Sequence, residues 1–208
     1  MKLYKFRSTD NFLFLADMLV SERIYCPKLV ELNDPMEGIY DLKRDFTRHD
    51  GDYRRKFTIS TRSNITYDDI RICCFSSEIK SIQMWAHYGG AHRGLALEYD
   101  FSDIKNDLIE VKYDGLFYQF FTDKNENPSP RDILAIKTPE WKYESEYRLM
   151  SGEKFLSVEG RLNRVVLGMS FPRETERILR RLAPPNTIFS RVGLDSGNAC
   201  LSMYDLDK

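Results

Sequence analysis

The chain has 208 residues, of which 42% are hydrophobic and 13% aromatic. This composition excludes a disordered chain, because so many Phe and Tyr side chains can be buried to offset the entropy of ordering. The 31 Lys and Arg residues against 32 Asp and Glu residues give a net charge of −1, so no strong overall field attracts nucleic acid or an anionic membrane. The length predicts a single domain over residues 1–208.

No stretch reaches the roughly 18 apolar residues that cross a bilayer. The first seven residues, MKLYKFR, lack the apolar core of a signal peptide. We therefore expect a cytoplasmic protein with no membrane partner.

The cysteine and histidine residues are few and lack the spacing of a metal site. The four cysteines are Cys26, Cys73, Cys74 and Cys200, and the three histidines are His49, His87 and His92. We expect the cysteines to be buried and reduced. Because neighbouring residues of a strand point to opposite faces, Cys73 and Cys74 are not expected to form a disulfide with each other.

Hydrophobic periodicity predicts the elements of the first half of the chain. In chain order they are a strand at 3–7, a helix within 11–20 after capping residues 8–10, a strand at 23–30, a turn at 33–35, a strand at 71–76, a short helix or loop at 82–88 and a strand at 93–99. Residues 40–69 are polar and irregular, and predict one or two helices with a flexible connection.

The second half alternates between strands and helices in the same way. We expect a strand at 108–113, a helix or strand at 117–121, an exposed loop at 123–130, a helix at 131–137, strands at 144–150 and 165–170, a helix from Pro172 to about Leu182, and strands at the end. The mixture predicts an α+β fold with mixed or antiparallel central sheets and flanking helices.

Residues 141–148, WKYESEYR, form the first group that could carry chemistry. On a strand, Glu144, Glu146 and Arg148 would share one face, with alternate Cα atoms about 7 Å apart. Such a face is costly to bury unless it lines a cleft or pairs internally. In a cleft, one carboxylate could orient a nucleophile while the other stabilises a cationic centre. The alternative is a solvated edge strand with an ion pair between Glu146 and Arg148.

A second group combines residues 73–77 with residues 84–88. Ser76, at the end of a predicted strand, could bind a sugar or a phosphate. Trp85, His87 and Tyr88 could supply a stacking wall and a titratable hydrogen-bonding group. The alternative is core packing for Trp85 and a surface hydrogen bond for His87.

The third group joins Arg7 to the turn at 33–37. Arg7 ends the first predicted strand, where its guanidinium could bind a phosphate through two hydrogen bonds. Asn33 is a candidate binding residue beside it, although Asn33 and Asp34 are also ordinary turn formers.

The sequence has no phosphate-binding Walker loop, dinucleotide-binding glycine motif, hydrolase nucleophile elbow or zinc-binding HExxH helix. Nucleotide hydrolysis by a Walker site, Rossmann redox chemistry and zinc hydrolysis therefore lack support, and we expect no metal.

Six ordered motifs resemble the bacterial family catalogued as domain of unknown function 2971. They are LYKFR at 3–7, LNDPME at 32–37, CCFS at 73–76, MWAHY at 84–88, RGLALEY at 93–99 and WKYESEYR at 141–148. This resemblance names relatives and implies no particular reaction.

The chain also resembles the ADP-ribosyltransferase fold, which places an Arg, His or Tyr on a first strand, a Ser or Tyr on a middle strand and a catalytic Glu on a later strand. Here Arg7 (or Tyr4), Ser76 and Glu144-Ser145-Glu146 occur in that order. The resemblance implies a split sheet, NAD as co-substrate, and NAD binding by Arg7 and Ser76.

In the same scheme Glu146 stabilises the oxocarbenium-like centre as nicotinamide leaves, and Glu144 positions the acceptor. Trp85 or Tyr88 would stack on the nicotinamide, with His87, Asn33 and Arg148 as further binding residues.

Three functions are compatible with these patterns. The first is an NAD-consuming transferase or glycohydrolase of the toxin or phage-defence type, with a small-molecule nucleotide as ligand and a protein or nucleic acid as acceptor. The second is a non-catalytic module that binds a nucleotide or a partner protein. The third is a metal-independent nuclease using His87, Arg93 and Glu146, which the balanced net charge disfavours.

Overall fold

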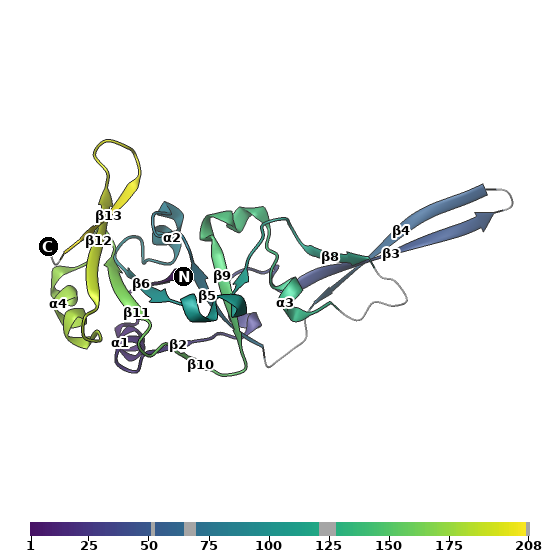
Figure 1. Ribbon diagram of the computed structural model, residues 1–208. Coiled ribbons are helices and arrows are strands. Elements are labelled where there is room, and N and C mark those ends of the chain that lie inside the picture. Colours follow the sequence, from purple (N-terminus) through teal and green to yellow (C-terminus); the bar gives the residue numbers. More distant parts are fainter. Residues whose placement is uncertain (51–52, 65–69, 121–127, 207–208) are drawn as a thin grey trace.

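The computed structural model describes residues 1–50, 53–64, 70–120 and 128–206, and its centre is a mixed eight-stranded sheet (Figure 1). The strand order is β13-β12-β11-β6-β1-β5-β9-β7. The bounds are β1 (Lys2–Arg7), β5 (Arg71–Ser76), β6 (Leu95–Asp100), β7 (Ile109–Glu110), β9 (Glu146–Ser151), β11 (Leu162–Leu167), β12 (Ile188–Leu194) and β13 (Leu201–Asp205). The predicted α+β class is confirmed.

The strands of this sheet pair antiparallel except for β11 and β12, which run parallel. A parallel pair needs a crossover connection, and α4 (Arg173–Leu182) provides it. Pro172 is the N-cap of this helix, where a fixed φ fits the entry into the first turn. The predicted helix start at Pro172 therefore lies within one residue of the observed one.

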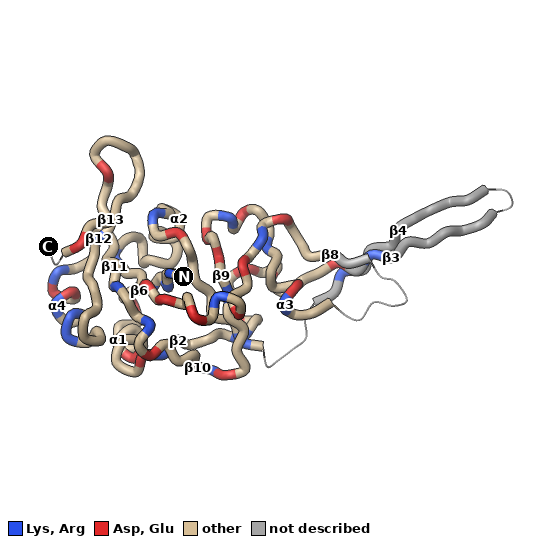
Figure 2. The backbone as a smooth tube through the Cα atoms, in the orientation of Figure 1, with Lys and Arg blue, Asp and Glu red and all other residues tan. Residues whose placement is uncertain are grey.

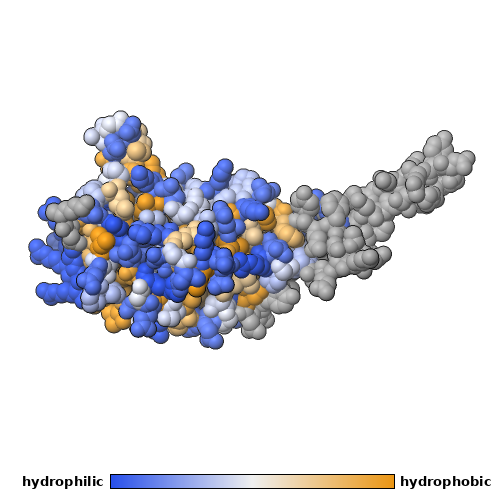
Figure 3. Space-filling model, in the orientation of Figure 1, coloured by the Kyte–Doolittle hydropathy of each residue, from blue (hydrophilic) through white to orange (hydrophobic). Residues whose placement is uncertain are grey.

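Successive residues of β1 point to opposite faces of the sheet, so the strand contributes to a core on each face. Leu3 packs in the larger core with α1 (Phe12–Val20) and α4. Phe6 packs in the smaller core with α2 (Ile82–His87). The face of the molecule in Figure 3 is hydrophilic over most of its described surface, with apolar residues in separate patches.

The sheet opens between β1 and β5. Tyr4 and Ser76 are the one pair that the register between these two six-residue strands contains. On their other sides both strands are fully paired, β1 with β6 and β5 with β9. The halves of β1 and β5 beyond Tyr4 and Ser76 therefore face a gap instead of each other.

Two smaller sheets accompany the large one. β2 (Arg23–Tyr25) pairs with β10 (Phe155–Ser157), and a second sheet has the order β4 (Tyr53–Asn64), β3 (Ile39–Asp50), β8 (Phe117–Phe120). The β3–β4 hairpin extends away from the body (Figure 1). Helices expected within 40–69 were wrong, because the strand alternation there is hidden by charged residues on both faces. Residues 51–52 and 65–69 lie outside the described part.

The remaining helices are short: η1 (Leu29–Glu31), η2 (Ser102–Asp107), α3 (Pro130–Ile133) and η3 (Pro139–Glu144). Two predictions change accordingly, and a third is largely untested. The strand expected at 23–30 ends at Tyr25, since Pro27 and then η1 follow. Glu144 belongs to η3 and not to the strand. The loop expected at 123–130 falls largely on residues 121–127, outside the described part.

The cysteines are all free, as predicted, but only Cys26 and Cys73 are buried; Cys74 is half-buried and Cys200 is exposed. Cys73 packs in the larger core and Cys74 against a separate cluster, which confirms that they point to opposite faces. Over the described residues, no helix has the length and apolar character needed to cross a membrane.

Gly94 precedes β6 at a close backbone approach, which gives a test of this packing. A Cβ at this position would collide with the carbonyl oxygens of Arg7 and Gly89. We expect Gly94→Ala to lower the free energy of unfolding by about 1–3 kcal/mol, the usual range for overpacking. Urea denaturation measures this loss. Gly152→Ala, where a Cβ meets nothing within 4 Å, should change stability by less than about 0.5 kcal/mol; equal effects would contradict the packing.

Candidate functional site

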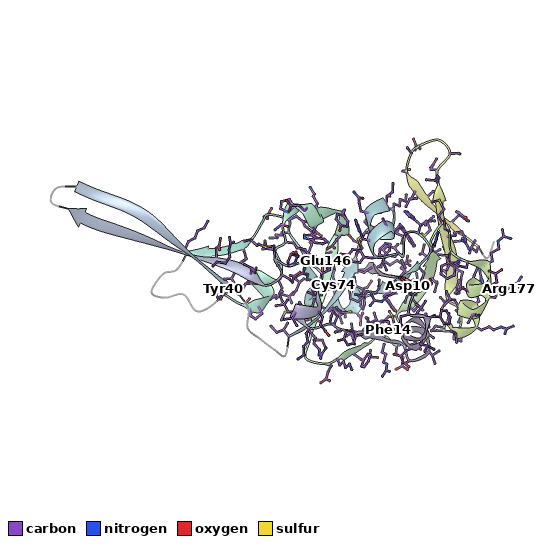
Figure 4. The ribbon with its side chains drawn as sticks, turned by 180° about the vertical axis from the view of Figure 1, so that it is seen from behind. Asp10, Phe14, Tyr40, Cys74, Glu146 and Arg177 are labelled. Atoms are coloured by element: carbon purple, nitrogen blue, oxygen red, sulfur yellow. The ribbon has the colours of Figure 1, made fainter. Side chains whose placement is uncertain are left out.

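A cavity of about 520 Å³ occupies the opening between β1 and β5. It is lined by α1 on one face of the sheet and by α2 on the other, so it reaches through the gap. Six of the residues predicted from the sequence line it: Arg7, Asn33, Ser76, Tyr88, Glu144 and Glu146. In Figure 4, Cys74 and Glu146 lie near each other in the body, between Tyr40 at the root of the hairpin and Asp10.

Two cations of β1, Lys5 and Arg7, line the α1 side of the cavity. Lys5 Nζ donates to the Cys74 carbonyl oxygen across the gap (2.6 Å), and Arg7 Nη1 donates to the Phe6 carbonyl oxygen (3.2 Å). Both accepting carbonyls belong to residues beyond the Tyr4–Ser76 pair, where β1 and β5 no longer pair with each other.

Neither of these cations forms an ion pair with a carboxylate of the described residues. Within the same part of the chain, the buried Nε of Arg7 has no hydrogen-bond partner. Burial lowers the pKa of Arg7, but a guanidinium stays protonated in proteins. An unpaired cation in a cavity wall is a favourable place for an anion.

Two carboxylates from η3 and β9, Glu144 and Glu146, line the α2 side, and one ammonium group bridges them. Lys137 Nζ donates to Glu144 Oε2 (2.6 Å) and to Glu146 Oε2 (3.2 Å). All three side chains are buried. Ser76 pairs with Tyr4 of β1 on one side and with Glu146 of β9 on the other, and its hydroxyl accepts from the backbone N–H of Glu78 (3.0 Å).

Arg148 contacts Glu146 and Glu37 and uses all five of its N–H groups. Nε and Nη2 each donate to Glu146 at 2.9 Å. Nη1 and Nη2 donate to the two carboxylate oxygens of Glu37 at 2.6 and 2.9 Å, and Nη1 also donates to the Leu134 carbonyl at 3.0 Å. The predicted role of Arg148 in binding a ligand is therefore corrected, because its donors are already engaged and it does not line the cavity.

This cluster holds three carboxylates, Glu37, Glu144 and Glu146, against two cations. Burial opposes ionisation of Glu146, but Arg148 and Lys137 outweigh it and lower its pKa to about 2. Burial raises the pKa of Glu144 and of Glu37 despite the cations beside them. Of these three carboxylates, Glu146 is thus the one most firmly held in its charged form.

The turn at 33–37 closes one side of the cavity and is fastened at both ends. Asn33 Nδ2 donates to the hydroxyl oxygen of Tyr88 (2.5 Å), which in turn donates to Glu144 Oε1 (2.5 Å). At the other end, Glu37 holds Arg148. The Asp34 carboxylate accepts from the backbone N–H of Met36, so the turn prediction is confirmed and Asn33 also reaches the site.

Glu144 lies at the site because the residue after it, Ser145, has a left-handed backbone conformation. The alternation of a strand, which the sequence predicted, does not place it there. Ser145, between η3 and β9, has φ 43° and ψ 54°. Its carbonyl accepts from the backbone N–H (2.9 Å) and the hydroxyl (3.1 Å) of Ser77. These bonds hold the bend that turns Glu144 toward Lys137.

Two aromatic predictions are not supported by their placement. Trp85 is fully buried, its Nε1 donates to the Ile79 carbonyl (2.7 Å), and its ring packs edge-on against Phe6. Core packing, the stated alternative, is therefore correct. His87 is exposed on α2 beside Tyr143 and does not line the cavity.

Arg93 is also exposed and outside the cavity lining. The proposed nuclease group of His87, Arg93 and Glu146 is not brought together. Across the described residues, no group of three or more His, Cys, Asp or Glu side chains is arranged to hold a metal ion.

Sequence reasoning missed Lys5 and Lys137, and it included Glu37 only as part of the 33–37 turn. Lys5 had a visible signal, since it shares the strand face of Arg7. The sequence contains no sign of the partners of Glu37 and Lys137, because each acquires them through contacts with a distant strand. Cys74 also lines the cavity, but burial raises the pKa of its thiol well above the usual value, so it remains protonated and a weak nucleophile.

Comparison with family models finds that residues 84–149 match the family described as "Protein of unknown function (DUF2971)". The resemblance stated above is confirmed on this stretch, which contains Tyr88, Lys137, Glu144, Glu146 and Arg148. The cations of β1, the 33–37 turn and Ser76 lie outside the match. Neither a curated protein nor a solved structure matches the chain.

Replacing Arg148 tests whether this guanidinium holds the cluster. Arg148→Lys keeps one charge but cannot supply five donors, so Glu37 or Glu146 would be left buried without a full partner. We expect a loss of about 3–5 kcal/mol in unfolding free energy, measured by urea denaturation. Arg23→Lys is the control, because Arg23 pairs with Asp17 at a half-exposed site and should cost less than about 1 kcal/mol. If Arg148→Lys lost no more stability than Arg23→Lys, Arg148 would not hold the cluster together.

The low pKa of Glu146 predicts a specific acid sensitivity. A carboxylate whose folded pKa lies below its ordinary value of 4.5 stabilises the fold above that value and loses this contribution as the pH falls toward about 2. Glu146→Gln should remove that part of the acid-induced loss, in thermal melts between pH 5 and pH 2. An unchanged slope in the variant would show that Glu146 does not titrate in this way.

Proposed function

We propose that the cavity binds a dinucleotide of the NAD type and that the protein consumes NAD as an ADP-ribosyltransferase-like enzyme. The observation that carries this proposal is that Arg7, Ser76 and Glu146, which come from three separate strands, line one cavity. The family match supports membership in a family without an assigned reaction, and the reaction is inferred from the site.

The distribution of charge in the cavity favours such a ligand. Lys5 and Arg7, which have no acidic partner among the described residues, offer cationic groups to a diphosphate, which carries negative charge and accepts hydrogen bonds. Two other carboxylates of the lining, Asp10 and Glu31, are already hydrogen-bonded, by Ser8 and by Tyr25. The cavity volume of about 520 Å³ lies within the usual range of small-molecule sites.

The carboxylates on the other side of the cavity suit cleavage of the nicotinamide–ribose bond. That bond breaks with its electron pair leaving on nicotinamide, so positive charge develops on the ribose. A carboxylate that is fixed and already ionised stabilises this charge without reorganisation. Glu146 meets both conditions, because Arg148 and Lys137 hold its position and lower its pKa to about 2.

Glu144 is placed to act on the acceptor. Its pKa is raised by burial, which makes it a better proton acceptor than Glu146. The acceptor's nucleophilic atom would bond to the ribose carbon as nicotinamide departs, and its proton would pass to Glu144 and then to water. With water as acceptor, the same step is a glycohydrolase reaction.

A non-catalytic nucleotide-binding module is the second candidate. It is favoured by the engagement of both Glu146 oxygens with Arg148 and Lys137, since a structural carboxylate would be held in the same way. The two candidates differ in one observable, the release of nicotinamide.

Glu146→Gln should abolish that release. We expect purified protein to liberate nicotinamide from NAD, measured by chromatography, and the variant to fall by at least about 100-fold, the loss usual for one electrostatic catalytic group. Glu78→Gln is the matched control, because Glu78 is an exposed carboxylate outside the cavity lining. NAD binding by the wild type without any release would favour the binding module. Toxicity on expression that depends on Glu146 would support an effector role.

Arg7→Gln separates binding from chemistry. Loss of a charge-assisted hydrogen bond to a diphosphate should raise KM for NAD about 10- to 100-fold while kcat changes little. Calorimetric titration with ADP-ribose should show the same weakening. An unchanged KM would place the diphosphate elsewhere.

A further inference from the structure

The function proposed for the cavity gives no role to the β3–β4 hairpin. Beyond Lys43, where the pairing with β8 ends, the described residues of this hairpin form a ribbon of two strands alone. Seven residues of β3 continue past that point, a length of about 23 Å at the strand rise. Figure 1 shows this ribbon extending away from the body.

The charge of the chain is divided between this hairpin and the body. Residues 39–64 contain seven Lys and Arg and four Asp, a net charge of +3. The rest of the chain contains the other 24 Lys and Arg and 28 Asp and Glu, a net charge of −4. The overall value of −1, which disfavours a polyanionic partner, therefore conceals a basic segment.

The strand register pairs two arginines in the far half of the ribbon. It sets Arg48 opposite Arg55, and His49 opposite Arg54. Like charges directly opposite each other in a ladder destabilise it, so an anion bound beside Arg48 and Arg55 would relieve their repulsion. At the root of the hairpin the pattern differs, because Arg62 forms an ion pair with Asp41 at 3.2 Å.

We infer that the β3–β4 hairpin is an arm that binds duplex DNA. A two-stranded ribbon has the dimensions that the major groove of B-DNA admits. Arginine is well suited to phosphate oxygens and to guanine edges. The arm belongs to a different part of the molecule from the cavity, so this inference does not depend on NAD consumption.

The test removes charge from the arm of the full chain. The variant Arg48→Gln/Arg54→Gln/Arg55→Gln is compared with wild type by fluorescence anisotropy with a labelled duplex of about 20 base pairs, longer than the ribbon. We expect at least about a tenfold loss of affinity near 0.1 M salt. The slope of log affinity against log salt should fall by about 0.9 for each phosphate contact removed.

A second triple variant controls for net charge. Arg173→Gln/Arg177→Gln/Arg181→Gln makes the same charge change on α4, where all three side chains are exposed and basic residues gather in Figure 2. It should bind DNA as wild type does. Equal losses in both variants, or no binding by wild type, would overturn the inference.

A conservative variant separates binding from folding. Arg48→Lys/Arg54→Lys/Arg55→Lys keeps the charge and should retain most of the affinity and of the salt slope. The Gln variant should melt at the wild-type temperature or above it, because it relieves like-charge repulsion. Preference for the single strand of the same sequence over the duplex would also overturn the groove assignment.

Discussion

The five hydrogen bonds of Arg148 are the constraint on which the site depends. They join three parts of the chain: Glu37 at the end of the 33–37 turn, the Leu134 carbonyl after α3, and Glu146 on β9. A buried carboxylate that loses its cation costs several kcal/mol. Arg148 therefore fixes both the 33–37 turn, which forms one wall of the cavity, and the Glu146 carboxylate on β9. A change at Arg148 alters both.

The position of the cavity has an equally local cause. A sheet in which β1 and β5 paired along their whole length would have no gap, and its backbone groups would satisfy each other. Here Tyr4 and Ser76 hold the two strands together at one end. Beyond that pair Lys5 takes over an acceptor on β5, the Cys74 carbonyl. One side chain thus compensates for lost ladder bonds and keeps a positive charge in the cavity wall.

Much of this arrangement could be predicted from the sequence, and the failures have physical reasons. Period-two alternation placed Arg7, Ser76 and Glu146 on strands, and all three line the cavity. The same period misplaced Glu144, because a left-handed Ser145 is invisible to a periodic pattern. The hairpin was missed because apolar and charged residues occur on both of its faces. Lys137 was missed because its partners are fixed only by tertiary contacts.

The separation of charge across the cavity is a consequence of how Glu146 is neutralised. An unpaired arginine and a buried carboxylate in one cavity attract each other, and a direct ion pair between them would close the space. Glu146 already has two cations, Lys137 and Arg148, at 3.2 and 2.9 Å. The attraction left for Arg7 is correspondingly small, so the cavity stays open with a cation on one side and an ionised carboxylate on the other. The proposed ligand would place its phosphates on the first side and, as nicotinamide leaves, the positive charge of its ribose on the second.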